Sequence, residues 1–176
     1  MPESDSDCGG ITVYNYISGE PVTGFDDGRP VIVRNVDKPF DLAAFVRAHL
    51  YSSLATLAYG MKILSSEGVK IDRLMGHGGL FRHPVTGPKF LSSAVNAPVY
   101  TMRTAGEGGP YGMALLAAYT ADGNGMALDS FLEEKVFSDA SVTEMLPSED
   151  EVAGFNAYLE RFIKGLKVEK AAIDCF

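Results

Sequence analysis

The sequence has no tryptophan and only two cysteines among its 176 residues. Cys8 and Cys175 lie near opposite ends of the chain. Two thiols without a compact spacing make neither a zinc site nor a disulfide framework. We therefore expect both to be free thiols that play no structural part.

Basic residues are scarce as well. The chain has 15 Lys and Arg against 23 Asp and Glu, which gives a net charge of −8 and a pI near 4.8. A protein that grips nucleic acid needs a basic face to neutralise the phosphates. We therefore expect small molecules or proteins as partners, and no nucleic acid.

Long apolar runs and a signal peptide are also missing. No run reaches the roughly 18 apolar residues that a membrane span needs. Residues 1–10 are acidic and polar, the opposite of a signal peptide, and we expect them to be frayed. These features predict a cytoplasmic protein with no membrane span.

The common catalytic signatures are absent too. The chain has no GxxxxGK[ST], HExxH, GxSxG or CxxC motif, and Gly106-x-Gly108 followed by Gly112 is a poor match to GxGxxG. His77 and His83 are six residues apart, but no third ligand follows at a spacing that suits zinc. We therefore predict no metal site.

Two other groups with possible chemistry have simpler interpretations. Asp26 and Asp27 could form a metal or acid/base pair, but they stand in an Asp-Asp-Gly turn, where local hydrogen bonding by Asp already explains them. His49 falls on the apolar stripe of an expected helix, where a packed, hydrogen-bonded histidine is the common case.

What the sequence does have is enough apolar content for a core. Hydrophobic residues make up 46% of the chain, and its length suits one domain over residues 1–176. Four segments rich in β-branched or apolar residues are expected strands. They are residues 11–17, 30–34, 69–75 and 99–102.

Helical periodicity is strongest between residues 42 and 66, with Asp41 as the N-cap and Gly68 just after the end. Residues 111–119 are apolar and small, which predicts a buried helix packed on a sheet. The remaining expectations are helices over 86–96 and 128–137, a loop over 138–148, and a long docking helix over 148–167 opened by a capping box.

Two glycine-rich turns stand out in this pattern, and each follows an expected strand. The first is Gly76-His77-Gly78-Gly79, and the second runs from Thr104 to Gly112. Glycines remove Cβ atoms where the chain leaves a sheet, which suits the close approach of a planar base or a phosphate. Either turn alone could be a plain connection. Two turns in the same sense suggest one site.

Four motifs in a fixed order carry a family resemblance. They are Gly68-Val-Lys-Ile-Asp-Arg-Leu, Gly-His-Gly-Gly-Leu-Phe, Asn96-Ala-Pro-Val and Thr104-Ala-Gly-Glu-Gly-Gly-Pro-Tyr-Gly-Met-Ala-Leu-Leu-Ala. Over about residues 42–166 the chain resembles the carboxy-terminal domain of the FGGY carbohydrate kinases, nearest to the xylulokinase and ribulokinase branches. The resemblance implies an α/β, ribonuclease H-like (actin-like ATPase) fold with a mixed sheet flanked by helices.

The resemblance also implies a nucleotide site and a reaction. The family's enzymes transfer the ATP γ-phosphoryl group to a sugar, here a pentulose-like one, using Mg²⁺. By position, the adenine and ribose loop corresponds to Gly78 and Gly79, with Gly76 as a further cofactor-binding residue, and His83 falls near the base. The inner wall of the pocket corresponds to Gly106, Gly108 and Gly109. Leu80-Phe81-Arg82-His83 departs from the small polar residues that usually end this loop.

The parts that do the chemistry are not recognisable in this chain. In the family, the phosphate loop and most sugar contacts come from an amino-terminal domain, and the catalytic aspartate lies near the domain junction. Asp5 and Asp7 stand close to that junction, but a frayed start gives them no fixed geometry and we assign neither the role. We expect weak ATP or ADP binding without turnover, and a homodimer formed through the apolar face that the missing amino-terminal domain leaves uncovered.

Two other classes of function stay open at this point. The domain could be a non-catalytic interaction or regulatory module that keeps the fold without nucleotide. It could instead be a small metal-dependent hydrolase using Asp26, Asp27 and the histidines.

Overall fold

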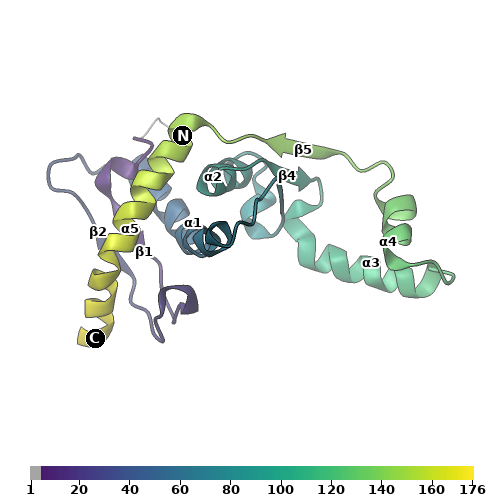
Figure 1. The fold of residues 1–176 in the computed structure, drawn as a ribbon, viewed down its shortest axis with the longest axis horizontal. Coiled ribbons are helices and arrows are strands. Elements are labelled where there is room, and N and C mark those ends of the chain that lie inside the picture. The colour runs from purple at the N-terminus through teal and green to yellow at the C-terminus, as the bar shows by residue number, and fades with distance from the viewer. Residues whose placement is uncertain (1–4) are drawn as a thin grey trace. The chain divides into compact units, whose positions relative to one another are not determined.

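Two long helices and a short antiparallel hairpin build the first of two compact units in the computed structural model, which describes residues 5–176. This unit comprises the described residues up to Ile71, Phe90–Ala97 and Pro147–Phe176. Its elements are η1 (Cys8–Gly10), β1 (Thr12–Tyr14), η2 (Pro21–Thr23), β2 (Val31–Val33), α1 (Leu42–Ser66), the second half of α2 (Thr86–Val95) and α5 (Glu149–Cys175). Helix α5 packs against α1 and β1 (Figure 1).

Helix α1 has the bounds that its sequence pattern predicts. The Asp41 side chain accepts a hydrogen bond from the Ala44 amide at 2.8 Å, which satisfies one of the first amides of the helix. After Ser66 the chain turns at Gly68, whose φ of 76° is the left-handed conformation that favours glycine. Both the N-cap and the terminating glycine are confirmed.

The core of the first unit is aromatic. Its largest fully buried side chains are Tyr14, Tyr51, Phe155, Tyr158 and Phe162. Tyr51 packs against Phe155 with ring centroids 4.9 Å apart, and Tyr14 packs against Phe162 at 4.8 Å. Burial raises the pKa of the Tyr51 and Tyr158 hydroxyls. Three of these five side chains come from α5, which confirms it as a docking helix.

Polar groups at the edge of this core are paired. The Arg47 guanidinium binds the Glu151 carboxylate, and both side chains are nearly buried. His49 packs edge-on against Phe45 and its Nδ1 lies 3.1 Å from Asn15 Oδ1. The interpretation of His49 as a packed, hydrogen-bonded histidine is therefore confirmed. Cys8 is buried and Cys175 exposed, and both are free thiols.

The second unit, Asp72–Lys89 and Pro98–Leu146, is built on a mixed three-stranded sheet. Strand β3 (Leu74–Gly76) runs parallel to β4 (Val99–Met102), and β5 (Val142–Met145) pairs antiparallel with β4. The other elements are η3 (Gly79–Arg82), the start of α2, η4 (Ala105–Glu107), α3 (Gly108–Asp122), α4 (Leu128–Phe131) and the π-helical turn η5 (Leu132–Val136). The mixed sheet with flanking helices is the expected fold class.

Several element bounds differ from the sequence expectations. The strand expected over 69–75 is formed only by Leu74–Gly76, because only that stretch pairs with β4. The stretch 138–148, expected to be a loop, contains β5. Its residues are mostly exposed and do not alternate between apolar and polar, and the strand exists because β4 offers an unpaired edge. The helix expected over 128–137 divides into α4 and η5.

Two helices also differ in character from the expectation. Helix α3 has no buried residue, and Met113 is 68% exposed, so the predicted buried helix is wrong. An apolar composition indicates that a helix could be buried. In the structure, the described residues of the second unit leave α3 exposed. At the start of α5, the Ser148 side chain makes no capping hydrogen bond, and the Glu151 side chain binds Arg47. The capping-box prediction is therefore wrong, and α5 continues past residue 167 to Cys175.

The first ten residues were expected to be frayed. From Asp5 on they are ordered, because η1 packs against α1 and α5, and residues 1–4 lie outside the described part. Within residues 5–176, no helix combines the length and the apolarity needed to cross a membrane. The expectation of one domain over 1–176 stays a prediction.

Candidate functional site

The two glycine-rich turns lie side by side in the second unit. The amide of Gly78 donates a hydrogen bond to the carbonyl oxygen of Ala105 at 2.7 Å. An exposed ion pair between Arg82 and Glu107, 2.8 Å long, joins the same two segments. Because β3 and β4 are parallel neighbours, the turns that follow them leave the sheet at the same edge. The two turns are therefore in contact, and that they form one site stays a prediction.

Three of the six glycines predicted as site residues present bare backbone to open space. A Cβ atom added at Gly78, Gly79 or Gly109 would meet no heavy atom within 4 Å. Gly78 also has a φ of 102°, which L side chains rarely adopt. These three positions are where a flat group could lie against the main chain.

The other three glycines have a different role, which is close packing within the turns. A Cβ atom at Gly76 would overlap the ring of Phe81, and one at Gly108 would come within 2.8 Å of His77 Nδ1. At Gly106 it would lie 3.0 Å from Arg82 Cγ. These glycines let neighbouring side chains fold onto the turns, and so set their shape.

His83 lies at the start of α2. Its Nδ1 is 3.2 Å from the Thr86 amide and 2.9 Å from the Thr86 hydroxyl, so the ring accepts a hydrogen bond from the first turn of that helix. His77, by contrast, lies against Gly108. The two histidines therefore make different contacts. No group of three or more His, Cys, Asp or Glu side chains suited to a metal occurs within residues 5–176.

Two adjoining cavities lie in this unit, between strand β4 and the segment before β5. The smaller, of about 180 Å³, is mostly apolar, and the larger, of about 430 Å³, is more polar. They share the lining residues Met102, Thr104, Tyr111 and Phe137. Of the predicted site residues only Gly76 and Gly108 line either cavity.

Sequence reasoning missed the residues that line these cavities. Met102 ends strand β4, and Arg103 and Thr104 follow it, a position where ligand-binding side chains are common, so their place in the chain was the available signal. Phe137 gave no such signal, because it lies at the end of a segment that was expected to be a plain amphipathic helix, and in the structure it follows η5.

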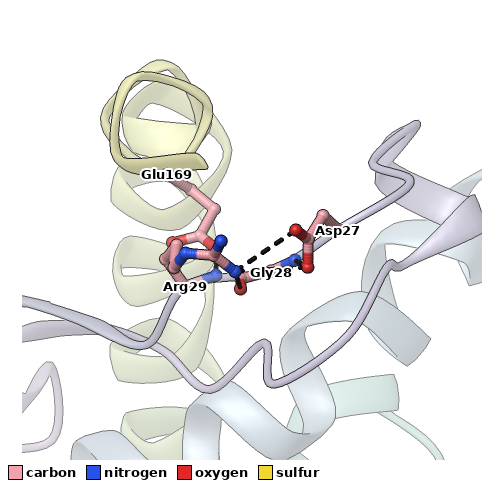
Figure 2. Close-up of polar contacts among 4 residues, drawn as sticks. All are labelled: Asp27, Gly28, Arg29 and Glu169. Carbon is pink, nitrogen blue, oxygen red and sulfur yellow. Dashed lines mark hydrogen bonds and ion pairs between the residues drawn. The ribbon is translucent and has the colours of Figure 1, made fainter. Parts of the chain in front are cut away.

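Two of the acidic residues considered for catalysis, Asp7 and Asp27, have structural partners in the first unit. Asp7 accepts a hydrogen bond from the Gly9 amide at 3.1 Å and forms an ion pair with Arg161 at 3.0 Å. Asp27 accepts from the Gly28 amide at 2.8 Å and binds Arg29, as expected for turn chemistry (Figure 2). These contacts give the metal-dependent hydrolase no support.

A buried carboxylate lies beside the same loop. Glu169 of α5 is fully buried, and its Oε1 accepts a hydrogen bond from the Arg29 amide at 2.8 Å (Figure 2). Its other oxygen, Oε2, is buried without a hydrogen-bond partner. Burial raises the pKa of this carboxyl, and the bond from Arg29 opposes the shift only in part.

Three solved structures with a similar fold are described as sugar kinases. A ligand-bound xylulose kinase from Lactobacillus acidophilus superposes with a TM-score of 0.67 at 17% identity, covering 94% of this chain and 32% of that one. A kinase from Brucella ovis described as a xyloylose kinase gives 0.68 at 19% identity, covering 97% and 34%. A gluconate kinase from Lactobacillus acidophilus gives 0.64 at 17%, covering 94% and 32%.

These similarities define the fold class first. The chain has the α/β, ribonuclease H-like fold of the actin-like ATPases, and it spans about a third of the length of these solved structures. The comparison with curated proteins gives no match. Residues 1–121 match the model of the C-terminal domain of the FGGY family of carbohydrate kinases. The chain belongs to this family.

Proposed function

We propose that this chain is the nucleotide-binding part of an ATP-dependent sugar kinase that phosphorylates a pentulose-like sugar of the xylulose or ribulose type. The observation that carries the proposal is the pairing of the two glycine-rich turns through the Gly78 amide and the Ala105 carbonyl. Family membership supports the reaction class, and the names of two of the three similar structures support the sugar.

The adenosine of ATP suits the bare backbone at the turns. Gly78, Gly79 and Gly109 leave space in which a base and a ribose can approach the main chain. His83, held at the start of α2, supplies a polar ring near the base in this proposal. The groups near the turns do not suit Mg²⁺ in the same way, since Glu107 is engaged by Arg82. The ligands of Mg²⁺ therefore belong to the rest of the parent protein.

Phosphoryl transfer needs more than this chain provides. The reaction depends on positioning the two substrates and neutralising charge from both lobes of the enzyme. We therefore propose that the catalytic aspartate and the sugar contacts lie in an amino-terminal domain, which is the main partner of this chain. In a sugar-dependent ADP-release assay the 176-residue chain alone should give no turnover.

A direct test uses the melting temperature with millimolar ADP. A ligand that binds only the folded state stabilises it in proportion to RT ln(1 + [L]/Kd), so weak binding raises Tm by a few degrees. Gly79→Leu fills the open space at the turn and should remove the shift. Gly60→Ala, which adds a methyl group in α1 at an ordinary contact distance of 3.5 Å from Val22, should keep it.

The competing function is a non-catalytic interaction or regulatory module. The departure at Leu80–His83 and the His77 ring on Gly108 favour it, because both crowd a turn that is otherwise bare. If ADP leaves the Tm of the wild-type chain unchanged, this module replaces the kinase proposal.

Two further parts of the proposal concern assembly and location. Apolar side chains on α3, among them Met113 and Leu116, are about half exposed or more, and we propose that this surface supports a homodimer. A monomeric mass in light scattering at tens of micromolar would contradict the dimer. A cytoplasmic location completes the proposal.

A further inference from the structure

A third cavity, of about 380 Å³, lies wholly in the first unit. It is bounded by β1, by the end of β2 and by α5. None of its lining residues belongs to the glycine-rich turns or to the second unit. Its size falls in the range of small-molecule sites. The lining residues are Gly10, Thr12, Tyr14, Val33, Arg34, Asn35, Arg161, Lys164, Gly165 and Val168.

The charge of this cavity is opposite to that of the chain. Three of its ten lining residues, Arg34, Arg161 and Lys164, are cationic and none is acidic, whereas the net charge of the whole chain is −8. Asp7 balances Arg161 through an ion pair of 3.0 Å. Arg34 and Lys164 form no ion pair with the described residues, and Arg34 lies over the Phe40 ring at 5.8 Å. Two unbalanced cations from two different elements therefore face this cavity.

Buried contacts hold the floor and walls of the cavity in place. Tyr14 is fully buried, packs on Phe162 at 4.8 Å and donates its hydroxyl proton to the Phe162 carbonyl at 2.9 Å. A Cβ atom at Gly165 would overlap that hydroxyl. At Gly10, with a φ of 79°, a Cβ atom would lie 3.0 Å from Asn35 Cβ. The cavity is preformed, and its two glycines allow Tyr14 and Asn35 to pack closely against the backbone.

One buried donor at the cavity also lacks a partner. Arg161 Nε is buried and makes no hydrogen bond, although the same guanidinium binds Asp7 through another nitrogen. A buried polar group without a partner is uncommon in folded proteins. Because solvent does not reach this nitrogen, it does not face the open cavity, and Arg161 contributes only its charge there. The cavity thus combines cations with an apolar wall that includes Val33 and Val168.

We propose that this cavity binds a small organic phosphate, a phosphate monoester whose anionic head lies between Lys164 and Arg34. The short carbon body of the ligand lies against Val33 and Val168. Charge-assisted hydrogen bonds from Lys and Arg hold the head, since these are the stronger kind. The inference does not rest on the proposed nucleotide site, because the two share no residue.

The test uses glycerol 3-phosphate as the probe. Its binding to the 176-residue chain is measured by calorimetry and by the chemical shifts of the Gly10 and Gly165 amides. Inorganic phosphate is the second arm. We expect saturable binding of glycerol 3-phosphate in the millimolar range, several times tighter than that of inorganic phosphate, because the carbon body adds apolar contact. No saturable binding of either probe would overturn the proposal.

Two variants of α5 provide the matched comparison. Lys164→Glu reverses a charge at the cavity and should weaken glycerol 3-phosphate binding at least about tenfold, as expected for loss of a charge-assisted contact. Lys167→Glu makes the same change one turn along, at an exposed residue that does not line the cavity, and should leave the affinity within about twofold. Equal weakening by both variants would show only a general charge effect and overturn the proposal.

Both positions are exposed, so both variants should fold. A melting temperature close to that of the wild type checks this point. An ADP titration distinguishes the phosphate site from the nucleotide site. Gly79→Leu should lose the ADP response and keep the response to glycerol 3-phosphate. Loss of both responses in Gly79→Leu would contradict the assignment of the phosphate site to the first unit.

Discussion

The two units of this chain differ in how much each buries. The first has five fully buried aromatic side chains from β1, α1 and α5, tied to one another by ring contacts of about 5–6 Å. The second has a three-stranded sheet, and its longest helix, α3, has no buried residue. The first unit therefore supplies most of the hydrophobic stabilisation. The second unit carries the candidate nucleotide turns and contributes less of this stabilisation.

This difference suggests a division of labour. Loops that bind ligands are drawn from the less stable parts of proteins, because backbone that is left bare cannot also form a core. Gly78, Gly79 and Gly109 leave open space that a core would fill. The following changes test the division, from the largest expected effect to the smallest.

Truncation of a core ring should have the largest effect. Phe155→Ala removes a fully buried side chain from the aromatic cluster and should lower the free energy of unfolding by about 3–5 kcal/mol. Leu116→Ala makes a similar change on α3, where the side chain is 47% exposed, and should cost about 0.5 kcal/mol or less. Urea unfolding followed by circular dichroism measures both. Similar losses of unfolding free energy in Phe155→Ala and Leu116→Ala would contradict the difference between the two units.

A pair of glycine substitutions sharpens the same contrast. In Gly165→Ala the new methyl group would overlap the Tyr14 hydroxyl, so the variant should lose about 1–3 kcal/mol. In Gly109→Ala the methyl group meets open space near the start of α3, and alanine favours the helix, so stability should rise slightly. Melting temperatures compare the two. Destabilisation by Gly109→Ala would contradict the open space around Gly109 in the structure.

Glu169 predicts a pH dependence in the first unit. Burial raises the pKa of this carboxyl above the ordinary value of 4.5, so the folded state binds the proton more tightly than the unfolded state. The stability contribution of Glu169 therefore falls as pH rises from about 4.5 through the folded pKa. Glu169→Gln removes the charge and should raise Tm at pH 7 by about 3 °C, equivalent to roughly 1 kcal/mol.

The pH profile separates this effect from a general change in packing. The advantage of Glu169→Gln over the wild type should shrink below about pH 4.5, where the carboxyl is protonated in both states. If Glu169→Gln raises Tm equally at pH 4 and pH 7, the raised pKa of Glu169 is not the cause of the effect. Other carboxylates titrate alike in both proteins and cancel in the difference.

The two thiols provide the smallest and simplest comparison. Burial raises the pKa of Cys8 to about 12, so almost no thiolate is present at pH 8. Cys175 is exposed near the end of α5. A thiol reagent should label one cysteine per chain under native conditions and two in urea. Labelling of both thiols at similar rates in the folded protein would show that η1 opens readily.

The sequence predicted the elements that local signals control. Asp41, Gly68 and the apolar stripe between them define α1 without help from distant residues, and its bounds are correct. The order of the glycine motifs was enough to indicate the fold class and the pairing of the turns. These features depend on residues that are close in the chain or arranged in a fixed order.

The errors arose where distant residues decide the outcome. Strand β5 forms because β4 has an edge to pair with, and nothing in residues 142–145 signals that edge. Helix α3 is apolar in composition, but what covers it depends on which surfaces reach it. Glu151 was read as part of a capping box, and a partner 104 residues away, Arg47, holds it instead.

The central claim is that the paired glycine turns hold the adenosine of ATP or ADP, and backbone amide chemical shifts measured during an ADP titration test it most directly. The account predicts that the amides of Gly78, Gly79 and Gly109 shift together and saturate, while those of Phe155 and Tyr158 stay in place. Saturable shifts confined to other residues, or no shift with millimolar ADP, would contradict it.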